Sequence, residues 1–189
     1  ERGRVSVDGV IMSELGARAR WSDRIQVDGT DVITRPEMVV FALNKPLGVV
    51  SSMADEHGRP CLGDLVRELP YRLFHVGRLD EQTEGLLILT NDGDLAQRLA
   101  HPRYEISKTY LATVEGEVTR GDLRRLLDGV ELEDGPIQFD QAVVKQTQGN
   151  QSILEVVLHS GRNRIVRRSL AAIGHPVRRL VRTHIGGLG

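Results

Sequence analysis

Cysteine, aromatic residues and long apolar runs are all scarce in this chain of 189 residues. The single cysteine, Cys61, has no partner for an internal disulfide and cannot form a multi-cysteine zinc site. No apolar run approaches the ~20 residues that a membrane-spanning helix needs. We therefore expect a protein of the reducing cytoplasm that has no membrane partner.

Sequence motifs for nucleotide cofactors and for serine hydrolases are also missing. The chain contains no Gly-x-x-x-x-Gly-Lys-Ser/Thr loop, no Gly-x-Gly-x-x-Gly and no Gly-x-Ser-x-Gly elbow. The six histidines are scattered, and none forms a spaced metal-ligand pair with Cys61. We expect neither a cofactor nor a metal site.

Acidic residues are absent from residues 159–189, which contain seven arginines. The other 158 residues carry 18 basic and 26 acidic side chains, so the net charge of −1 hides a separation of charge along the chain. This asymmetry predicts a surface for a polyanion such as RNA. A solvated, arginine-rich helix face would give the same composition, and the residues alone leave both interpretations open.

The pattern of apolar residues and turn signals predicts an α+β fold with a mixed, largely antiparallel sheet flanked by helices. Strands and helices do not alternate regularly, which argues against a parallel βαβ arrangement. We expect strands at residues 39–43, 73–76, 86–89, 108–114, 138–145 and 152–158. We expect helices at residues 64–69, 92–99, 121–127 and 164–173.

The N-terminal segment contains an internal repeat. Arg4-Val-Ser-Val-Asp-Gly9 returns twenty residues later as Arg24-Ile-Gln-Val-Asp-Gly29. Each copy alternates apolar and polar residues and ends in Asp-Gly, a strong signal for a β-hairpin. Two such units are too small for a large core, so we expect a separate module, joined to the rest through Arg35-Pro36.

The most informative stretch runs from Gly77 to Gly93 and places Asp80 on a loop before the apolar run 86–89. A reactive side chain is well held where a loop enters a rigid strand. A solvated acidic turn is the commoner meaning of such residues. A glycosidase-like carboxylate pair from Asp80, Glu81 and Glu84 is a further alternative, although aromatic residues for stacking a sugar are only 4% of the chain.

Four motifs in this order resemble those of RNA pseudouridine synthases, specifically the RsuA/RluB branch. They are Leu43-Asn-Lys-Pro46, the stretch Gly77-Arg-Leu-Asp80 with Thr83-Glu-Gly-Leu-Leu87, then His101-Pro-Arg-Tyr104 with Lys108-Thr-Tyr110, and Gly161-Arg-Asn-Arg-Ile-Val-Arg-Arg168. The resemblance covers nearly the whole chain and favours a catalytic Asp80 over an inert turn. It implies the pseudouridine synthase fold and an isomerisation that needs no redox carrier and no metal.

The resemblance also implies roles for individual residues. Asp80 matches the catalytic aspartate that acts on the target uridine, and Arg78 matches the arginine that helps extrude the nucleotide. Tyr110 matches the tyrosine that stacks on the flipped base, and Arg167 matches the basic residue that pairs with the aspartate. For RNA binding we expect Lys45, Lys108, Arg162, Asn163, Arg164, Arg168, Arg178, Arg179 and Arg182.

The resemblance divides the chain into a partial S4-like RNA-binding segment with its linker, residues 1–36, and a catalytic domain, residues 37–189. The leading helices of the S4 domain would precede Glu1, and the family's chain usually continues past the position of Gly189. We therefore expect that both ends of the chain are incomplete.

The expected substrate is ribosomal RNA, because the motifs look most like the RluB side of the branch, which modifies 23S rRNA near the peptidyl-transferase centre. Ile165 departs from the polar residue that is common in that pattern. A small-subunit (16S) enzyme and a catalytically silent rRNA-binding protein of the same fold are the alternatives. We expect the protein to act as a monomer.

Overall fold

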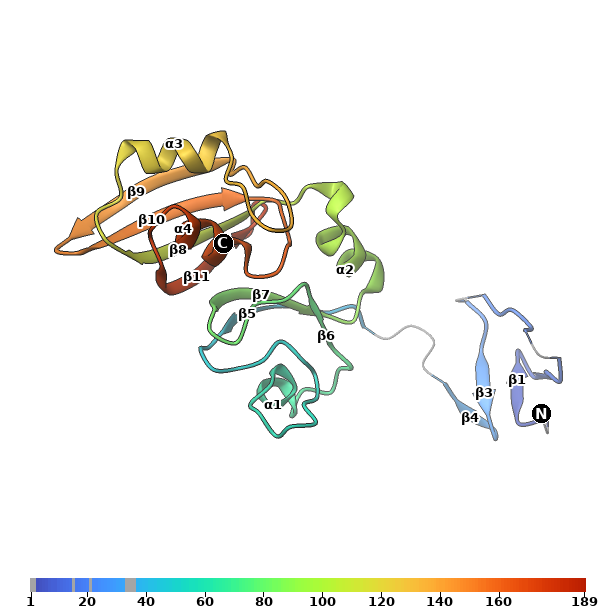
Figure 1. Cartoon of the computed structure of the whole chain (residues 1–189). Helices are drawn as coiled ribbons and strands as arrows, with labels where there is room; N and C mark the ends of the chain where they lie inside the picture. Colours follow the sequence, from blue (N-terminus) through green and yellow to red (C-terminus); the bar gives the residue numbers. More distant parts are fainter. Residues whose placement is uncertain (1–2, 15, 21, 33–36) are drawn as a thin grey trace. The chain divides into compact units, whose positions relative to one another are not determined.

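The computed structural model describes residues 3–14, 16–20, 22–32 and 37–189. The chain divides into two compact units, Glu1–Met38 and Val39–Gly189 (Figure 1). The sequence places the boundary after Pro36, two residues earlier. The predicted linker, Arg35-Pro36, lies outside the described residues, so that prediction stays open.

The first unit contains a sheet of four short strands in the order β2-β1-β3-β4. They are β1 (Val5–Val7), β2 (Val10–Ile11), β3 (Ile25–Val27) and β4 (Thr30–Asp31). Asp8 and Asp28 have positive φ angles of 47° and 52°, as do the glycines that follow them, so both Asp-Gly pairs form tight hairpin turns. This confirms the two hairpins predicted from the repeat.

The two copies of the repeat pair with each other in an antiparallel register. Val5 lies opposite Val27, and Val7 lies opposite Ile25. The backbone N–H of Asp8 donates to the carbonyl of Arg24 at 2.9 Å, and the N–H of Asp28 donates to the carbonyl of Arg4 at 2.8 Å. The two copies of the repeat are therefore related by a local two-fold axis, and each supplies hydrogen-bond partners to the other.

The second unit is built on one mixed, seven-stranded sheet in the order β5-β7-β11-β8-β10-β9, with β6 also paired to β7. Only the β7–β11 pair is parallel; the other pairs of this sheet are antiparallel. The strands are β5 (Val40–Lys45), β6 (Phe74–Val76), β7 (Glu84–Thr90), β8 (Lys108–Glu115), β9 (Gln141–Gln148), β10 (Gln151–Leu158) and β11 (Val177–Ile185).

The helices of this unit are α1 (Leu62–Val66), α2 (Gly93–Ala100), α3 (Arg120–Asp128) and α4 (Ile165–Ala172), with a 3₁₀ turn, η1 (Pro102–Tyr104). The expected α+β fold with a mixed sheet is confirmed. Among the described residues, no helix is long and apolar enough to cross a membrane.

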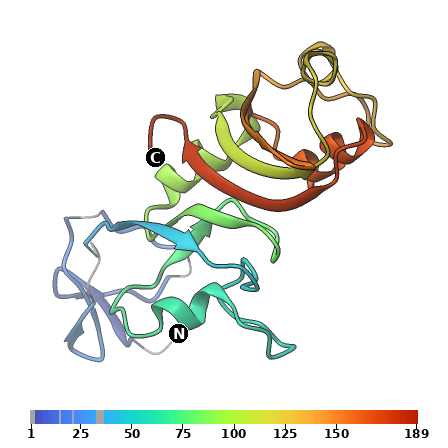
Figure 2. The ribbon, with the colours of Figure 1, turned by 90° about the vertical axis from the view of Figure 1, so that its left-hand side faces the viewer.

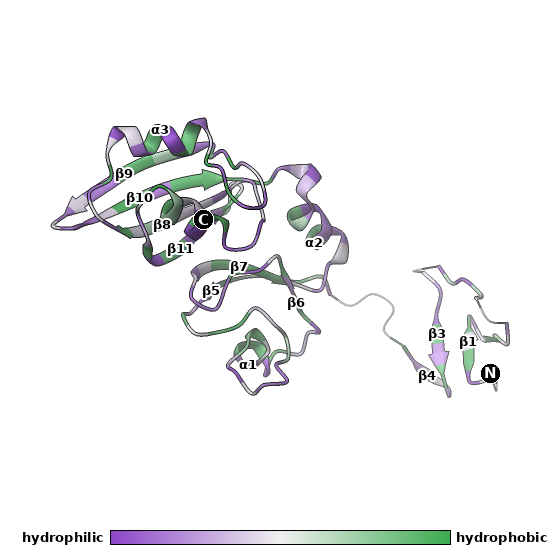
Figure 3. Cartoon of the chain, in the orientation of Figure 1, coloured by the Kyte–Doolittle hydropathy of each residue, from purple (hydrophilic) through white to green (hydrophobic). Residues whose placement is uncertain are grey.

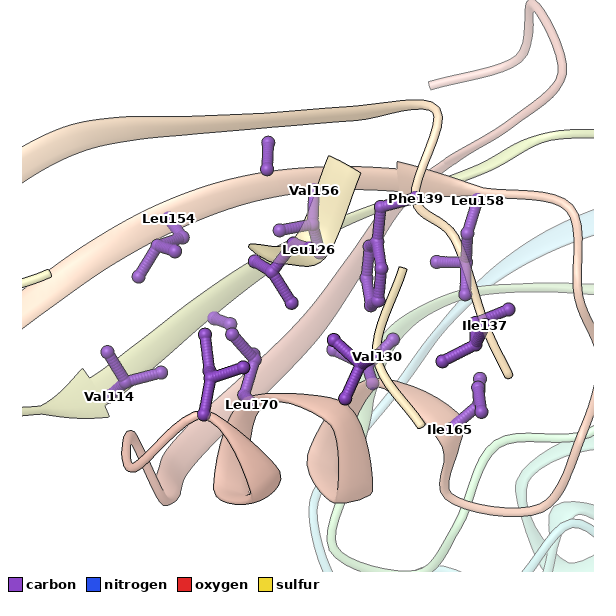
Figure 4. Packing of buried hydrophobic residues seen from close by; sticks show 14 of the residues in the cluster. Val114, Leu126, Val130, Ile137, Phe139, Leu154, Val156, Leu158, Ile165 and Leu170 are labelled. Atoms are coloured by element: carbon purple, nitrogen blue, oxygen red, sulfur yellow. The ribbon is translucent and has the colours of Figure 1, made fainter. Parts of the chain in front are cut away.

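The main core lies where α3 and α4 cover one face of the β8–β10–β11 part of the sheet. β10 alternates strictly, and Leu154, Val156 and Leu158 are fully buried. Leu126 of α3 and Leu170 of α4 point into the same cluster (Figure 4). Figure 3 shows hydrophilic and hydrophobic residues interspersed along α3, the pattern of a helix that buries one face.

The sequence prediction contains no strand at 177–185, yet β11 is central in the sheet. β11 runs beside β8 in both ribbon views (Figures 1 and 2). Its pairing with β8 shifts register between Val177 and Arg179 and again between Arg182 and His184. These irregularities break the alternation of inward and outward residues, so the period of two that identifies a strand is hidden.

Strands β6 and β11 share one edge of β7 and separate along it. Thr90 pairs with Val40 of β5 on one side and Phe74 of β6 on the other. Gly85 pairs with β5 on the first side and with Arg182 of β11 on the second. β11 therefore covers the start of β7 and β6 covers its end, and the backbone between them needs another hydrogen-bond donor.

Gly85 makes the β7–β11 contact possible. Its φ angle is +106°, and a Cβ atom there would lie 2.2 Å from the carbonyl oxygen of Arg182. Only glycine combines this backbone conformation with so close an approach. The glycine of the Thr83-Glu-Gly-Leu-Leu87 motif is thus explained by strand packing.

Candidate active site

A cleft of about 1020 Å³ lies where β6 and β11 separate. The loop 77–81 and the strand ends beside it form one wall, and β8 and β11 contribute Tyr110 and Arg182. The segment 160–166, which leads into α4, also lines the cleft. The cleft therefore brings together three of the four motifs that carry the family resemblance.

Asp80 lines this cleft and is partly exposed. Its carboxylate has no hydrogen-bond or ion-pair partner among the described residues. An unpaired carboxylate at the wall of a cleft is available to a substrate, whereas most acidic side chains around it are occupied. Glu84, for example, accepts two hydrogen bonds from Arg179, at 2.9 and 3.1 Å.

The backbone around Asp80 is fixed by four consecutive carbonyl groups that all accept hydrogen bonds. Ser51 Oγ donates to the carbonyl of Leu79 at 2.7 Å and accepts from its N–H at 3.1 Å. The carbonyl of Asp80 accepts from the N–H of Thr83 at 2.9 Å, which closes a turn. The carbonyl of Gln82 accepts from Arg167 Nη2 at 2.5 Å.

The remaining carbonyl of the turn, that of Glu81, accepts from the N–H of Gly48 at 2.9 Å and from Lys45 Nζ at 3.4 Å. Apart from the N–H of Thr83, these donors come from two distant parts of the chain, residues 45–51 and Arg167. The loop that carries Asp80 is therefore held in place by hydrogen bonds to four consecutive carbonyls, as the placement of a reacting group requires.

Arg167 does not pair directly with Asp80. No ion pair of 4.0 Å or less joins the two side chains, both of which lie within the described residues. The Arg167 guanidinium donates to the carbonyls of Gln82 and Val177 instead, at 2.5 and 3.2 Å. The pKa of Arg167 is lowered, mainly because the side chain is partly buried, and the nearby Asp80 carboxylate opposes that change. Arg167 thus acts on Asp80 at longer range and through the backbone.

Arg78 and Tyr110 both line the cleft with Asp80. Arg78 is exposed, and its side chain makes no hydrogen bond or ion pair with the described residues. Tyr110 is half-buried on β8, directly opposite Arg182 of β11. The structure therefore places three of the four residues predicted for catalysis on the cleft surface, and it places Arg167 behind the turn.

The sequence predicts an RNA contact for Lys45, whereas the structure buries this residue completely. Lys45 Nζ donates to the carbonyls of Pro46 and Val49 at 2.9 and 2.7 Å, in addition to Glu81. Burial lowers the pKa of Lys45, and the carboxylates of the Asp80 turn oppose that change. Its geometry is that of an internal support for the loop, with no charge presented to solvent.

Five of the arginines predicted to bind RNA are already engaged within the chain. Arg162 donates to the carbonyls of residues 134–136, and Arg168 binds the Asp134 carboxylate at 2.8 Å. Arg178 pairs with Glu115 and Arg179 with Glu84, while the Nε of Arg182 donates to the carbonyl of Leu86. Most arginines of the C-terminal segment are therefore bound to other parts of the same chain.

The other residues predicted to bind RNA, Lys108, Asn163 and Arg164, all line the cleft. Asn163 and Arg164 are exposed where the chain enters α4. Arg164 adopts a left-handed conformation with φ 48°, which is uncommon for a residue with a side chain. This conformation ends the preceding loop and starts the helix at the edge of the cleft.

Sequence patterns alone did not reveal two features of the cleft. Ser51 is 95% buried and makes two hydrogen bonds with the backbone of Leu79. A single serine after two apolar residues belongs to no recognisable sequence motif. Asp55 and Arg59 form an ion pair at 2.8 Å on the loop that borders the cleft, and because this segment is not helical, their i,i+4 spacing did not predict the pair. Within the described residues, no group of three or more His, Cys, Asp or Glu could hold a metal ion.

Comparison with protein families identifies the class. Residues 39–172 match the model of the family described as RNA pseudouridylate synthase, which is more than half of the chain. The chain belongs to this family of RNA-modifying isomerases. The family resemblance predicted from the four motifs is therefore confirmed, as is the expected enzyme class.

Individual relatives agree with this assignment. The chain is 52% identical over 190 residues to an uncharacterized RNA pseudouridine synthase of Mycobacterium tuberculosis, covering 98% of this chain and 75% of the relative. It is 44% identical to ribosomal large subunit pseudouridine synthase B of Bacillus subtilis, covering 96% and 75%. A crystal structure of a pseudouridylate synthase aligns with a TM-score of 0.70 at 28% identity, covering 98% of this chain and 79% of that one.

Proposed function

We propose that this enzyme converts one uridine of 23S ribosomal RNA to pseudouridine and that Asp80 is its catalytic residue. The observation that carries the proposal is the unpaired Asp80 carboxylate on a turn whose backbone is fixed at every residue from 79 to 82. The relatives named as large subunit synthases support the choice of 23S rRNA.

The proposed reaction begins with extrusion of the target nucleotide. Taking a base out of its stack costs about a few kcal/mol. Arg78, which is exposed at the mouth of the cleft, fills the space that the nucleotide leaves, and Tyr110 stacks on the flipped base. Both contacts offset the cost of extrusion.

The isomerisation then exchanges one bond of the base for another. The C1′–N1 bond breaks, the base rotates, and a C1′–C5 bond forms; the hydrogen on C5 leaves as a proton, and N1 gains a proton. An ionised Asp80 serves either as a nucleophile or as the base that removes a proton. In both cases the carboxylate must be accessible to the substrate, and no group among the described residues occupies it with a hydrogen bond or an ion pair.

Release of tritium tests this proposal. Ribosomal RNA labelled with tritium at C5 of uridine should release tritium to water with the parent enzyme and should release none with Asp80→Asn. Asp94→Asn is the matched control, because Asp94 is an exposed carboxylate on α2 whose side chain has no partner among the described residues. If the parent released no tritium from any rRNA, a role in RNA binding alone would replace the proposal.

Mapping pseudouridines in rRNA from cells with and without the gene would identify the substrate. Loss of one site in 23S rRNA is the expected result. Loss of a site in 16S rRNA would contradict the choice of subunit while leaving the chemistry intact.

We further propose that residues 1–36 are part of an S4-like segment that adds RNA contacts. Its support is the sheet of two Asp-Gly hairpins, too small to bury a core, with Val10 and Ile11 exposed at 65% and 63%. Removal of residues 1–36 should raise the KM for rRNA and leave kcat nearly unchanged. A fall in kcat with an unaltered KM would contradict this role.

A further inference from the structure

Two cations that line the cleft, Lys108 and Arg182, form no ion pair with the described residues. Lys108, the first residue of β8, is half-buried, and its ammonium has no hydrogen bond or ion pair among the described residues. Arg182 of β11 is only 5% exposed. Its Nε donates to the carbonyl of Leu86 at 2.8 Å, but its Nη2 is buried and unpartnered.

The position of Arg182 follows from the separation of β6 and β11. Leu86 lies on β7 between the residues that pair with β11 and those that pair with β6. The Nε of Arg182 supplies the donor that neither strand offers to the Leu86 carbonyl. This contact fixes the guanidinium of a residue that lines the cleft, and it leaves Nη2 without a hydrogen-bond partner among the described residues.

The two charges lie close enough to repel each other. Burial lowers the pKa of Lys108, and the charge of Arg182 lowers it further. The neighbouring arginines of β11 differ, because Arg178 and Arg179 each bind a carboxylate. Removing a charge from water without a counter-ion is costly, so two cations on one cleft with no carboxylate of the described residues bound to either indicate that an anion completes the site.

We propose that Lys108 and Arg182 together bind one phosphate group of the RNA, namely a phosphate attached to the nucleotide whose base stacks on Tyr110. This inference rests on the proposed function. Uracil is neutral, so the phosphates are the only anionic groups that an RNA substrate brings into the cleft. Tyr110 lies opposite Arg182 in the β8–β11 pairing, which puts the base and its phosphate on adjacent strands.

The chemistry of the two side chains suits one phosphate. A guanidinium presents fixed donors that match phosphate oxygens, and an ammonium adds a compact charge with rotatable donors. A phosphate held in this way would anchor the flipped nucleotide while its base rotates. The subsite therefore acts on substrate binding and orientation, whereas Asp80 acts on the reacting bonds.

Neutral phosphate analogues test the pairing. The probe is a synthetic rRNA fragment that carries the mapped uridine, with a methylphosphonate in place of the phosphate on its 5′ or its 3′ side. One of the two substitutions should lower kcat/KM of the parent about tenfold or more, the effect of losing a charged hydrogen bond. The same substitution should lower kcat/KM of the Lys108→Gln enzyme clearly less than that of the parent, because only Arg182 remains to bind the phosphate charge.

Lys145→Gln is the matched control. Lys145 lies on β9, is half-exposed and pairs with Glu155 at 3.3 Å, away from the cleft lining. This variant should show the same methylphosphonate penalty as the parent. An equal penalty in Lys108→Gln and the parent would overturn the proposal, as would the absence of a penalty at both positions.

A binding measurement separates this proposal from the proposed reaction. Uridine 5′-monophosphate, uridine 3′-monophosphate, uridine and inorganic phosphate are titrated in turn and followed by NMR of the protein. One uridine monophosphate should bind at least several-fold more tightly than uridine and inorganic phosphate, and this advantage should become clearly smaller in Lys108→Gln, which keeps only Arg182. That result would support the subsite even if no tritium were released, in which case only the proposed reaction would fail.

The opposite combination is equally informative. Normal tritium release together with equal affinities for uridine and both monophosphates would overturn the phosphate subsite and leave the proposed reaction intact. Inorganic phosphate that binds as tightly as the nucleotides would also overturn it, because the site would then accept a free anion with no relation to the base on Tyr110.

Discussion

Arg167 and Gln82 are 85 residues apart in the chain, yet Nη2 of Arg167 donates to the carbonyl oxygen of Gln82 at 2.5 Å. This bond joins α4, at the end of the catalytic unit, to the turn that carries Asp80. The family resemblance implies a pairing of Arg167 with the Asp80 carboxylate. In the structure, Arg167 instead binds the backbone carbonyl of Gln82, two residues after Asp80. Arg167 therefore supports the backbone of the turn that carries Asp80.

The first prediction concerns Arg167→Ala. Loss of the guanidinium leaves the carbonyls of Gln82 and Val177 without their donors, so the free energy of unfolding should fall by about 1–3 kcal/mol. The looser turn should lower kcat at least about tenfold while KM changes less, because an imprecisely placed carboxylate affects the transition state more than binding. Urea unfolding and steady-state tritium release measure the two effects.

Arg124→Ala is the control for that experiment, since Arg124 is exposed on α3 and its side chain has no partner among the described residues. It should leave both quantities unchanged. An Arg167→Ala enzyme with the stability and turnover of the parent would show that the turn does not depend on Arg167.

The second prediction concerns Ser51→Ala. The Ser51 hydroxyl is buried and makes two hydrogen bonds with the backbone of Leu79, the residue before Asp80. Removing it leaves a buried N–H and a buried carbonyl unpaired, which should cost about 1–3 kcal/mol of stability. Turnover should fall with little change in KM, and both are measured as for Arg167. A variant that lost stability but kept the full kcat would separate Ser51 from the placement of Asp80.

The third prediction concerns Gly85→Ala. A methyl group at Gly85 would meet the backbone oxygen of Arg182 at 2.2 Å and its nitrogen at 2.7 Å, at a φ angle of +106°. Since backbone atoms cannot move aside as a side chain can, β7 and β11 must separate. We expect a loss of about 3 kcal/mol or more, or failure to fold, from the combined clash and strain. Expression level and urea unfolding provide the measurement.

Gly93→Ala is the matched control for this change. Gly93 is the first residue of α2, and a Cβ atom there would meet nothing within 4 Å. Alanine should leave stability unchanged or raise it slightly, because it favours a helix more than glycine does. Similar losses at Gly85 and Gly93 would show that the close approach of β7 and β11 is not what requires glycine.

The contrast between Asp80 and Ser51 shows what the sequence could predict. Asp80 belongs to a motif whose order and spacing identify the family, so its loop and its neighbours on the cleft were predictable. Ser51 acts through the backbone of Leu79, 28 residues away, and Arg167 acts through the backbone of Gln82. Contacts between a side chain and a distant backbone group leave no pattern in composition or periodicity.

The arginines at 159–189 show the opposite difficulty. Their composition predicts a surface for a polyanion, but it does not reveal where the partners are. Asp134 and Glu115 lie far earlier in the chain, and only the fold brings them to Arg168 and Arg178. The same fold leaves Arg182 partly unpaired because the separation of β6 from β11 places it at the cleft. Which arginine remains available to an anion is thus decided by the sheet and not by charge density.

The last prediction concerns the acid side of the stability curve and the Asp55–Arg59 pair. The Asp55 carboxylate accepts from the side chain of Arg59 at 2.8 Å and from two backbone N–H groups of its own loop, at 2.9 and 3.1 Å. These contacts lower the pKa of Asp55 to about 2, with the Arg59 side chain as the main cause. The ionised form is therefore favoured in the folded loop.

The sign of the pH dependence follows from that lowered pKa. In the unfolded chain an aspartate has a pKa of ~3.9, so the contribution of Asp55 to stability is fully present above that pH. It is lost as the pH falls toward about 2, where the folded group also becomes protonated. Asp55→Asn should therefore be less stable than the parent at pH 5 to 7, and the difference should shrink steadily below about pH 4.

Urea unfolding of the parent and of Asp55→Asn at several pH values between 3 and 7 measures this difference. Arg59→Gln serves as the matched variant, because it removes the main cause of the lowered pKa and keeps the carboxylate. Its stability should depend less on pH than that of the parent in the same range. If the difference between the parent and Asp55→Asn stayed constant from pH 7 to pH 3, the ionised Asp55–Arg59 pair could not be what holds the loop at the border of the cleft.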